Sequence, residues 1–319
     1  MIDGEFWESK KVLITGGTGF LGSNIVKRLK TSKCELLLPR SKEYDLRYLD
    51  QAQQLIDNSS PDIIIHCAAK YGGIHVNKNN PAKIFVDNLL MNTNIFEASR
   101  EKQDCKFIGI GSSCGYPGHI EDYMKEDQFY NGAPHESVFT YGYVKRMLAV
   151  QAWAFEKEYN FNSIHLILPN MYGPFDGFSH ERSHAVAALI RRFVEISDVN
   201  SNEIVVWGDG SPIREFLFVE DAVDAILVAA SKLEGSSPLN IGTGKGTTIK
   251  RLVETISEIV QFKGNIIWDT TKPNGQPMKV MNNNRMIDLL GWRPQTSLRE
   301  GLQKTIDWYK TNKNFADRR

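Results

Sequence analysis

The sequence predicts an α/β fold in which a doubly wound parallel sheet is followed by a smaller C-terminal lobe. Short apolar runs alternate with stretches of helical periodicity as far as about residue 170, which is the pattern of strands and crossover helices. A glycine-rich turn joins the first apolar run to the first helical stretch. The alternation then becomes less regular, which indicates a second lobe.

The strands of the predicted sheet are short apolar runs bounded by polar or turn residues. They are expected at 11–15, 35–38, 62–67, 106–110, 163–168 and 239–242, with helices at 19–31, 46–58, 81–102 and 141–159. Later helices are expected at 185–194, 221–232, 248–260 and 298–311, and extended segments at 204–207 and 215–219. Without a low-complexity linker, we expect a first domain of residues 1–170, to which segments such as 215–245 contribute, and a second lobe of 171–319.

The composition is that of an ordinary globular protein. Its 319 residues are 41% hydrophobic and 24% charged, which allows a large core. The 38 basic and 38 acidic residues leave no net charge, so we expect neither a nucleic-acid surface nor a membrane anchor. The four cysteines lack metal-ligand spacing, so we expect no metal site and reduced thiols. An acidic N-terminal segment and no long apolar run predict a soluble, cytoplasmic protein.

The glycine-rich turn lies between the predicted strand 11–15 and the following helix. Gly16 would permit the tight turn, Gly19 the approach of a pyrophosphate, and Gly22 close packing of the helix. The phosphates would then lie at the helix N-terminus. The motif therefore predicts a Rossmann-type dinucleotide site, contacted in this turn by Gly16, Thr18, Gly19, Phe20, Leu21 and Gly22.

The residues after the second predicted strand bear on the choice of dinucleotide. Arg40 stands where an acidic residue would favour the ribose of NAD, and an arginine matches a 2′-phosphate better, so NADPH is the preferred cofactor. The alternative is a solvated loop arginine. Asp45 and Leu46 are expected near the adenine edge, and Glu43 together with Asp45 leaves NAD open.

Two sets of proton-transfer groups follow. Tyr141 and Lys145 are four residues apart, on one helical face, where the ammonium favours the phenolate by opposite-charge attraction. Ser112 can hydrogen-bond the same carbonyl oxygen, while Cys114 and His184 are residue types suited to moving a proton next to a carbonyl. Together they predict a ketone reductase that could also move protons on the adjacent carbon.

Each member of the second set also has a structural interpretation. Cys114 could be a small packing residue at a strand end. His184 lies just before a predicted helix and could help to cap it, beside Ser183, a natural N-cap residue. The two are therefore judged together, because an acid and a base at one site support each other.

The motifs come in the order found in the extended short-chain dehydrogenases of nucleotide-sugar metabolism, the NAD-dependent epimerase/dehydratase family. The chain resembles this family over nearly its whole length, through the glycine turn, 66–69, Asn88, 112–114, 141–145 and 169–174. Within the family it is similar to the GDP-L-fucose synthases. The runs that carry this similarity are 72–74, 111–114, 170–176, 183–184, 206–216 and 272–277.

The resemblance implies an NADP-dependent C4-reductase of a GDP-linked 4-keto-6-deoxyhexose. Tyr141 would protonate the alkoxide, tuned by Lys145, while Ser112 holds the oxygen. Cys114 and His184 would epimerise C3 and C5 first, because a reduced ketone no longer makes those protons acidic. The resemblance also implies a homodimer formed through helices 81–102 and 141–159.

The remaining site residues are implied by position in the family. Ala68 and Ala69 would contact the cofactor, together with Tyr141, Lys145 and His184. The substrate would meet Ser112, Ser113, Asn170, Arg192, Trp207, Arg214 and Lys279. Arg191 is interpreted as a solvated helix residue. Trp207 with Asp209 could border the guanine, although a strand tryptophan is more often a core residue.

Two departures from the family pattern leave the sugar open. Gly115 stands where a bulkier apolar residue is common, and Ala187 where a proline is usual. Both remove bulk or rigidity near the proposed epimerisation site, which suggests a roomier pocket for a GDP-linked 4-keto heptose, or an enzyme that only reduces while a separate epimerase acts first. A 4,6-dehydratase would need carboxylates where Ser113 and Cys114 stand. A 4-epimerase retains NAD and has no use for Cys114 with His184, and a non-catalytic redox sensor would not need Tyr141 with Lys145.

Overall fold

The computed structural model describes residues 3–70, 79–102, 104–180, 183–198 and 202–318. Its main sheet has six parallel strands in the order β2-β1-β3-β4-β5-β9. They are β1 Lys11–Thr15, β2 Glu35–Leu37, β3 Ile63–His66, β4 Lys106–Ser112, β5 Ser163–Leu168 and β9 Leu239–Asn240. The order reverses at β1, which places the expected ligand crevice at the carboxyl ends of β1 and β3. The predicted doubly wound α/β fold is confirmed.

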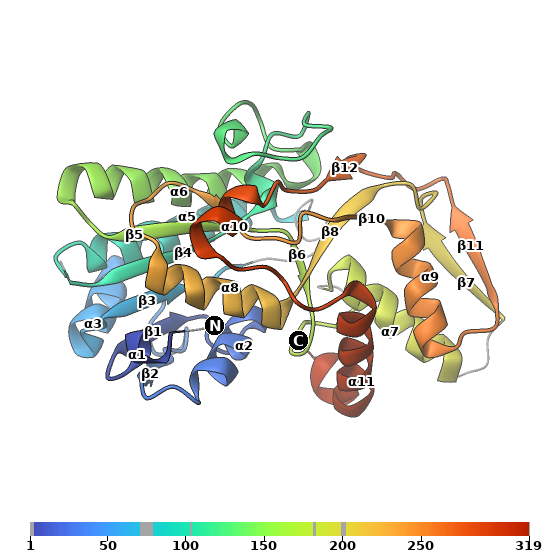
Figure 1. Ribbon diagram of the computed structural model, residues 1–319, viewed down its shortest axis with the longest axis horizontal. Helices are drawn as coiled ribbons and strands as arrows, with labels where there is room; N and C mark the ends of the chain where they lie inside the picture. The colour runs from blue at the N-terminus through green and yellow to red at the C-terminus, as the bar shows by residue number, and fades with distance from the viewer. Residues whose placement is uncertain (1–2, 71–78, 103, 181–182, 199–201, 319) are drawn as a thin grey trace.

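Helices cover both faces of this sheet (Figure 1). They are α2 Phe20–Leu29 and α8 Val219–Lys232 on one face, and α3 Leu49–Ser59, α5 Pro81–Ser99 and α6 Phe139–Tyr159 on the other. Val12 and Ile14 of β1 join the core under α2 and α8, whereas Leu13 joins the core under α3, α5 and α6. Alternate strand residues point to opposite faces, so one apolar strand supplies both cores.

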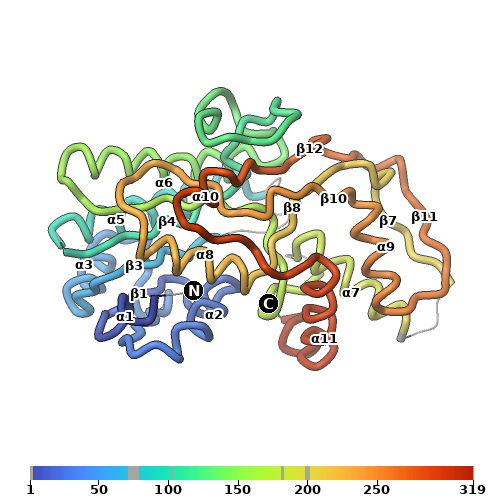
Figure 2. The backbone as a smooth tube through the Cα atoms, in the orientation of Figure 1, coloured from blue at the N-terminus to red at the C-terminus, as the bar shows by residue number. Residues whose placement is uncertain are grey.

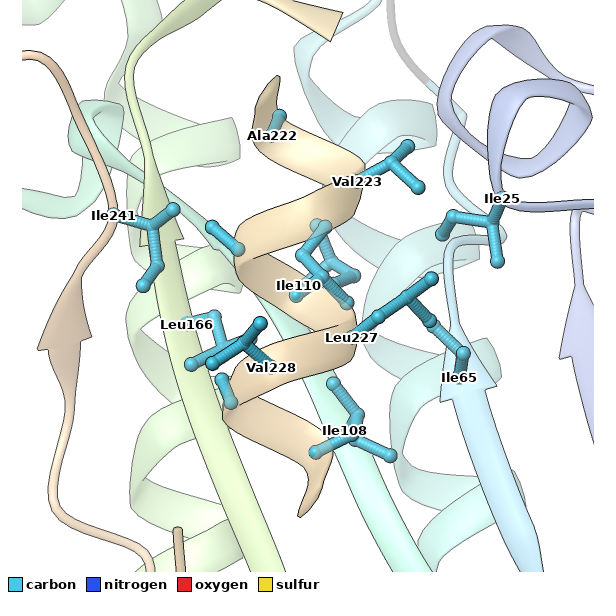
Figure 3. Close-up of a cluster of buried hydrophobic side chains, with 14 of the residues drawn as sticks. Ile25, Ile65, Ile108, Ile110, Leu166, Ala222, Val223, Leu227, Val228 and Ile241 are labelled. Carbon is cyan, nitrogen blue, oxygen red and sulfur yellow. The ribbon is translucent and has the colours of Figure 1, made fainter. Parts of the chain in front are cut away.

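The helix α8 comes late in the chain but packs on the main sheet. Figure 2 shows this segment lying against the early strands and α2. In the core, Leu227 of α8 lies beside Ile65 of β3, and Val228 lies beside Leu166 of β5 (Figure 3). Leu227 is fully buried, and burial of a leucine side chain contributes about 1.5–3 kcal/mol. The contacts explain why the chain returns to this sheet before β9.

The second lobe contains the helices α7 Ala185–Asp198, α9 Ile249–Val260 and α11 Leu298–Ala316 around their own apolar core. Its small sheets contain β6 Asn170–Tyr172, β8 Ile213–Phe218, β10 Gly246–Thr248 and β12 Met278–Lys279, and the parallel pair β7 Glu203–Trp207 and β11 Asn265–Asp269. The strand β6 follows β5 after one residue and pairs with β8, so it joins the two layers. In the parts of the chain that the structure describes, no helix is long and apolar enough to cross a membrane.

Several short elements were not predicted from the sequence. They are α1 Gly4–Trp7, α10 Asn284–Leu290, β6, β10, β11, β12 and the 3-10 turns Ser113–Gly115, Glu126–Gln128 and Glu136–Val138. The helices α6 and α8 each begin two residues earlier than expected, at Phe139 and Val219. Among them, the strands β6, β10 and β12 have only two or three residues and no periodicity of their own, because a partner strand from elsewhere in the chain defines them.

Candidate active site

The glycine-rich turn is wrapped tightly at the carboxyl end of β1. Gly16 has a φ of +67°, and a Cβ there would lie 2.8 Å from the backbone nitrogen of Ala68. A Cβ on Gly22 would lie 2.2 Å from the carbonyl oxygen of Gly16. The backbone N–H of Gly19 donates to that same oxygen at 2.8 Å. Only glycines allow strand, turn and helix to approach this closely.

The N-terminus of α2 is open to a ligand. Gly19 is the N-cap residue and provides no side-chain hydrogen bond, and Phe20 and Leu21 are the first helical residues. Their backbone N–H groups have no partner within the helix, so they can bind an anion. The side chains of Phe20 and Leu21 are buried in the core, while Thr18 is exposed at the turn. The turn therefore fits a pyrophosphate.

A series of buried hydrogen bonds supports the glycine-rich turn. The Thr15 hydroxyl lies 2.8 Å from Nδ1 of His66, and His66 Nε2 lies 3.0 Å from Oδ1 of Asn92. Burial lowers the pKa of His66 to about 4, so the ring is neutral at pH 7. The backbone N–H of Ala68 donates to the Thr15 hydroxyl at 3.2 Å. This network ties the end of β1 to the end of β3, where Ala69 is half-buried beside Ala68.

A cavity of about 600 Å³ extends from the turn toward the end of β2. Its lining includes Gly17, Thr18, Leu38 and the exposed Arg40. Arg40 and the turn therefore line the same cavity, and the contact of Arg40 with a 2′-phosphate stays a prediction.

Glu43 and Asp45, the acidic residues that left NAD possible as the cofactor, contact other groups of the protein. Asp45 pairs with Arg47 at 2.5 Å, and this hydrogen bond is the main cause that lowers the pKa of Asp45. A Glu43 carboxylate oxygen accepts from the backbone N–H of Arg40 at 3.4 Å. Leu46 is buried, and its carbonyl accepts from Asn94 at 3.0 Å. Arg47 therefore holds the Asp45 carboxylate, which leaves it less available to a ribose hydroxyl.

The helix α6 brings the tyrosine and lysine to the end of β4. Lys145 is buried, and its Nζ donates to the carbonyl oxygen of Ile110 at 2.8 Å. The same Nζ lies 5.7 Å from the centroid of the half-buried Tyr141 ring. Desolvation lowers the pKa of Lys145 to about 8. A Cβ on Gly142 would lie 2.4 Å from the Cys114 carbonyl oxygen, so this glycine lets α6 contact the turn that holds Cys114.

The serine and the cysteine occupy a single turn after β4. Ser112 ends the strand, and its hydroxyl accepts from the backbone N–H of Cys114 at 3.2 Å. Ser113 between them is buried. The Sγ of Cys114 accepts a hydrogen bond from Nζ of Lys279 at 3.1 Å. Burial raises the pKa of the Cys114 thiol, but Lys279, Ser112 and Lys145 oppose burial and together bring it below its usual value.

Lys279 and Arg214 arrive from neighbouring strands of the second lobe. Lys279 on β12 is in register with Arg214 on β8. Desolvation lowers the pKa of Arg214, while the Cys114 thiol raises it, so Arg214 also lies within electrostatic reach of that sulfur. Ser112, Cys114, Tyr141 and Lys145 are thus assembled with two cations that come from distant parts of the sequence.

Sequence reasoning missed the residue that fixes these cations. Glu215 is fully buried, and its carboxylate accepts from the backbone N–H groups of Thr243, Gly244 and Met281 at 2.5, 2.9 and 2.8 Å. Burial raises the pKa of Glu215, while those hydrogen bonds act against the rise. The carboxylate therefore ties β8 to the segment of β12. An acid inside an otherwise apolar strand was the available signal, because such a buried charge must be paired.

His184 comes from the second lobe, at the start of α7. Its carbonyl oxygen accepts the first helical hydrogen bond, from Ala188 N at 2.8 Å, so its backbone occupies the cap position, one residue after Ser183. The residue as a whole is solvent-accessible, yet its imidazole lies among enough protein atoms that desolvation lowers the pKa of the ring. It is therefore neutral at pH 7. Its joint action with Cys114 stays a prediction.

Two interpretations of the second lobe are wrong. Trp207 is 68% exposed on β7, so it is not a core residue, and Lys272 Nζ lies 5.8 Å from its ring centroid. Arg191 is 4% exposed and donates to the Phe178 carbonyl at 2.5 Å, so it is not solvated. The α7 helix turns one of the paired arginines into the lobe, because its apolar face is wide enough to enclose the side chain.

The other predicted substrate residues already have protein contacts. Arg192 is half-buried and donates to the Val205 carbonyl of β7. The exposed Asn170 donates from Nδ2 to the carbonyl oxygen of Glu215 at 3.2 Å. Asp209 accepts from the Ser211 N–H at 2.8 Å and stabilises a turn. Their contacts with a substrate stay predictions, and the run 72–74 lies outside the described residues.

The two departures from the family pattern lie in packed regions. A Cβ on Gly115 would lie 2.7 Å from the ring of Phe129, so that ring takes the space of a larger side chain. Ala187 is 1% exposed within the core of the second lobe. Phe129 therefore fills the space beside Gly115, while the hypothesis of a roomier substrate pocket stays a prediction.

Comparison with known proteins gives consistent matches. Residues 12–242 match the NAD dependent epimerase/dehydratase family. The chain is 36% identical over 306 residues to Putative GDP-L-fucose synthase 2 of Arabidopsis thaliana, covering 96% of this chain and 93% of the relative. It is similar to the crystal structure of a GDP-L-fucose synthetase from Naegleria fowleri bound to NADP, with a TM-score of 0.87, 29% identity, and 96% and 94% of the two chains covered. A GDP-6-OMe-4-keto-L-xylo-heptose reductase from C. jejuni shares the fold, with a TM-score of 0.88, 23% identity, and 95% and 98% covered.

Proposed function

The chain belongs to the NAD dependent epimerase/dehydratase family, and we propose that it is an NADPH-dependent C4-reductase of a GDP-linked 4-keto sugar. The observation that carries this proposal is the position of Lys145, whose ammonium lies between the Tyr141 ring and the end of β4. The substrate class follows the name of the Arabidopsis relative, and the cofactor follows the NADP-bound Naegleria structure.

The residues at the first crevice fit NADPH. The N–H groups of Phe20 and Leu21 would hold the pyrophosphate, Arg40 the 2′-phosphate, and Ala68 with Ala69 the segment beside β3. Asp45 and Leu46 would border the adenine. When bound, NADPH supplies the hydride that reduces the carbonyl carbon.

The protein supplies the proton for the same step. Tyr141 would donate its phenol proton to the carbonyl oxygen as that oxygen becomes an alkoxide. The buried ammonium of Lys145 stabilises the resulting phenolate by charge. Ser112 would orient the carbonyl oxygen from the end of β4. The three groups belong to α6 and β4, which are packed on each other.

Epimerisation would use the second set of groups before reduction. Cys114 and His184 would remove and return protons at C3 and C5 of the sugar while C4 is still a ketone. Arg192 and Arg214 would face the diphosphate, and the exposed Trp207 the guanine. The main sheet layer would thus bind the cofactor, with the later lobe binding the nucleotide sugar.

A substrate panel in heavy water tests this function. The protein with NADPH should oxidise the cofactor in the presence of GDP-4-keto-6-deoxymannose, and the product should carry deuterium at C3 and C5. A reductase that follows a separate epimerase, for example on a GDP-4-keto heptose, would oxidise NADPH without deuterium at those carbons. If NADPH binds but none of the GDP-linked 4-keto sugars is reduced, the proposed function is wrong.

The outward faces of α5 and α6 support a homodimer. Val86 and Leu90 on α5, with Val150 and Trp153 on α6, are exposed, and Trp153 is 56% exposed. The two helices lie side by side, joined by a hydrogen bond of 2.5 Å between Gln151 and Thr93. An exposed apolar face of this kind suits contact with a second copy. We also propose a cytoplasmic location, where the four free cysteines would stay reduced.

A further inference from the structure

The contact between Lys279 and Cys114 is built from distant segments. Nζ of Lys279 donates to Sγ of Cys114 at 3.1 Å, across 165 positions of sequence. The strand β12 has only two residues and is held by its pairing with β8. Two residues after Lys279, the Met281 N–H donates to the buried Glu215 carboxylate at 2.8 Å. A strand partner and a buried acid therefore fix the place of this lysine.

Three cations act on the Cys114 thiol. In the described part of the chain, the groups that act on its thiol are Lys279 of β12, Lys145 of α6 and Arg214 of β8, with the Ser112 hydroxyl of β4. Three cations that converge from three elements favour the thiolate and compensate the cost of burying it. Lys145 already donates to Ile110 at 2.8 Å. The direct hydrogen bond to the sulfur comes from Lys279.

We propose that Lys279 is a positioning residue that holds Cys114 as a thiolate, ready to act as the base of epimerisation. The inference rests on the proposed function and deepens it. The family resemblance assigned Lys279 to the substrate diphosphate, whereas its ammonium is in contact with the thiol. Lys279 touches no reacting atom in this role, because it acts through Cys114.

The proton balance of the step is simple. The thiolate takes the proton from the carbon beside the C4 ketone and becomes a thiol. The electron pair of the broken C–H bond forms the carbon–carbon double bond of an enolate, and the carbonyl electrons move to oxygen. His184, which is neutral at rest, takes up a proton from solvent and returns it to the opposite face of the carbon, and the ketone forms again; the Cys114 thiol then releases its proton to solvent. No oxidant or reductant is consumed. Because Lys279 acts only through Cys114, its loss should slow epimerisation more than reduction.

Thiol labelling tests the inference without relying on turnover. The full-length protein is exposed briefly to iodoacetamide at a series of pH values, and alkylation of the Cys114 peptide is quantified by mass spectrometry. The wild-type labelling midpoint should lie below that of an ordinary thiol, and Lys279→Met should raise it by about 1–3 pH units. Lys279→Arg should restore it in part. Lys263→Met, which removes an exposed lysine of the same lobe, should leave the midpoint unchanged.

A second readout separates the two proposals. In heavy water, the rate of proton exchange at C3 and C5 should be roughly 10–100-fold lower in Lys279→Met than in the wild type. The rate of NADPH oxidation, measured with a substrate that is already epimerised, should fall much less. An unchanged labelling midpoint in Lys279→Met, in a folded protein, overturns the inference even if the enzyme is active. If Lys279→Met does not fold, Lys279→Gln gives the same comparison. If the wild type reduces no GDP-linked keto sugar, the proposed function fails while the labelling still decides the role of Lys279.

Discussion

Lys145 donates a hydrogen bond of 2.8 Å to the backbone carbonyl of Ile110, and this bond anchors α6 on β4. The strand ends two residues later at Ser112, and Tyr141 lies one helical turn before Lys145. Tyrosine, lysine and serine are therefore held by one packed pair of elements. The first two predictions follow from that arrangement.

Replacing Tyr141 by phenylalanine should remove the proton donor and little else. We expect Tyr141→Phe to lower kcat for NADPH oxidation by about 10²–10⁴-fold, the usual contribution of a general acid. Exchange at C3 and C5 should persist, since Cys114 is unchanged. Stopped assays with both readouts check this, and Tyr143→Phe on the same helix is the matched control. Equal loss in the two variants would argue against a catalytic role for Tyr141.

The rate of reduction should depend on the charge of Lys145. Burial lowers its pKa to about 8, so the ammonium is present below that pH and is lost as the pH rises through it. We therefore expect kcat/KM for the keto sugar to fall above about pH 8. A profile from pH 6 to 10 measures it. In Lys145→Arg, the residual kcat/KM should stay constant to a higher pH, because arginine remains charged. A wild-type kcat/KM that does not change with pH would contradict a role for the Lys145 charge.

A methyl group at Gly22 should damage the cofactor site. A Cβ there would lie 2.2 Å from the Gly16 carbonyl oxygen, so Gly22→Ala must displace the turn or the start of α2. We expect NADPH affinity to fall at least about tenfold, which corresponds to about 1.4 kcal/mol. Fluorescence titration measures it. Gly4→Ala, where a Cβ meets nothing within 4 Å, is the control, and similar affinities in the two variants would refute the expectation.

Arg40 should distinguish the two dinucleotides. A hydrogen bond to a charged group contributes about 1.5–3 kcal/mol, so Arg40→Ala should weaken NADPH binding by roughly 10–150-fold and hardly change NADH binding. Calorimetric titration with both cofactors gives the ratio. Arg293→Ala removes another exposed arginine, outside this cavity, and serves as control. Equal weakening of NADPH and NADH would mean that Arg40 does not contact the 2′-phosphate.

A charge on the outward face of α6 should separate the proposed dimer. Trp153 is 56% exposed, and a glutamate in its place would be buried without a partner between two copies. We expect Trp153→Glu to shift the mass measured by light scattering from two chains to one. Trp207→Glu changes a tryptophan exposed on the other lobe and should stay dimeric. A wild-type protein that is already monomeric would disprove the interface.

The glycine turn, the strands of the main sheet and the tyrosine–lysine pair could be predicted because their requirements are local. Gly16, Gly19 and Gly22 meet steric requirements that arise within seven positions of sequence. The four-residue spacing alone puts Tyr141 and Lys145 on one helical face. The sequence did not reveal that Arg191 is buried while Trp207 is exposed. Burial depends on which face of an element meets the rest of the chain, and neighbouring residues do not decide it.

The sequence by itself determined the fold class and the dinucleotide turn, and it predicts the proton-transfer groups, since each depends on residues close along the chain. Only the tertiary structure decided that Lys279 meets Cys114 and that Glu215 fixes the strands that carry Lys279 and Arg214. These contacts join segments far apart in sequence, and the chain must close long loops before such charges can act on each other. The electrostatics of the thiol are therefore a property of the fold.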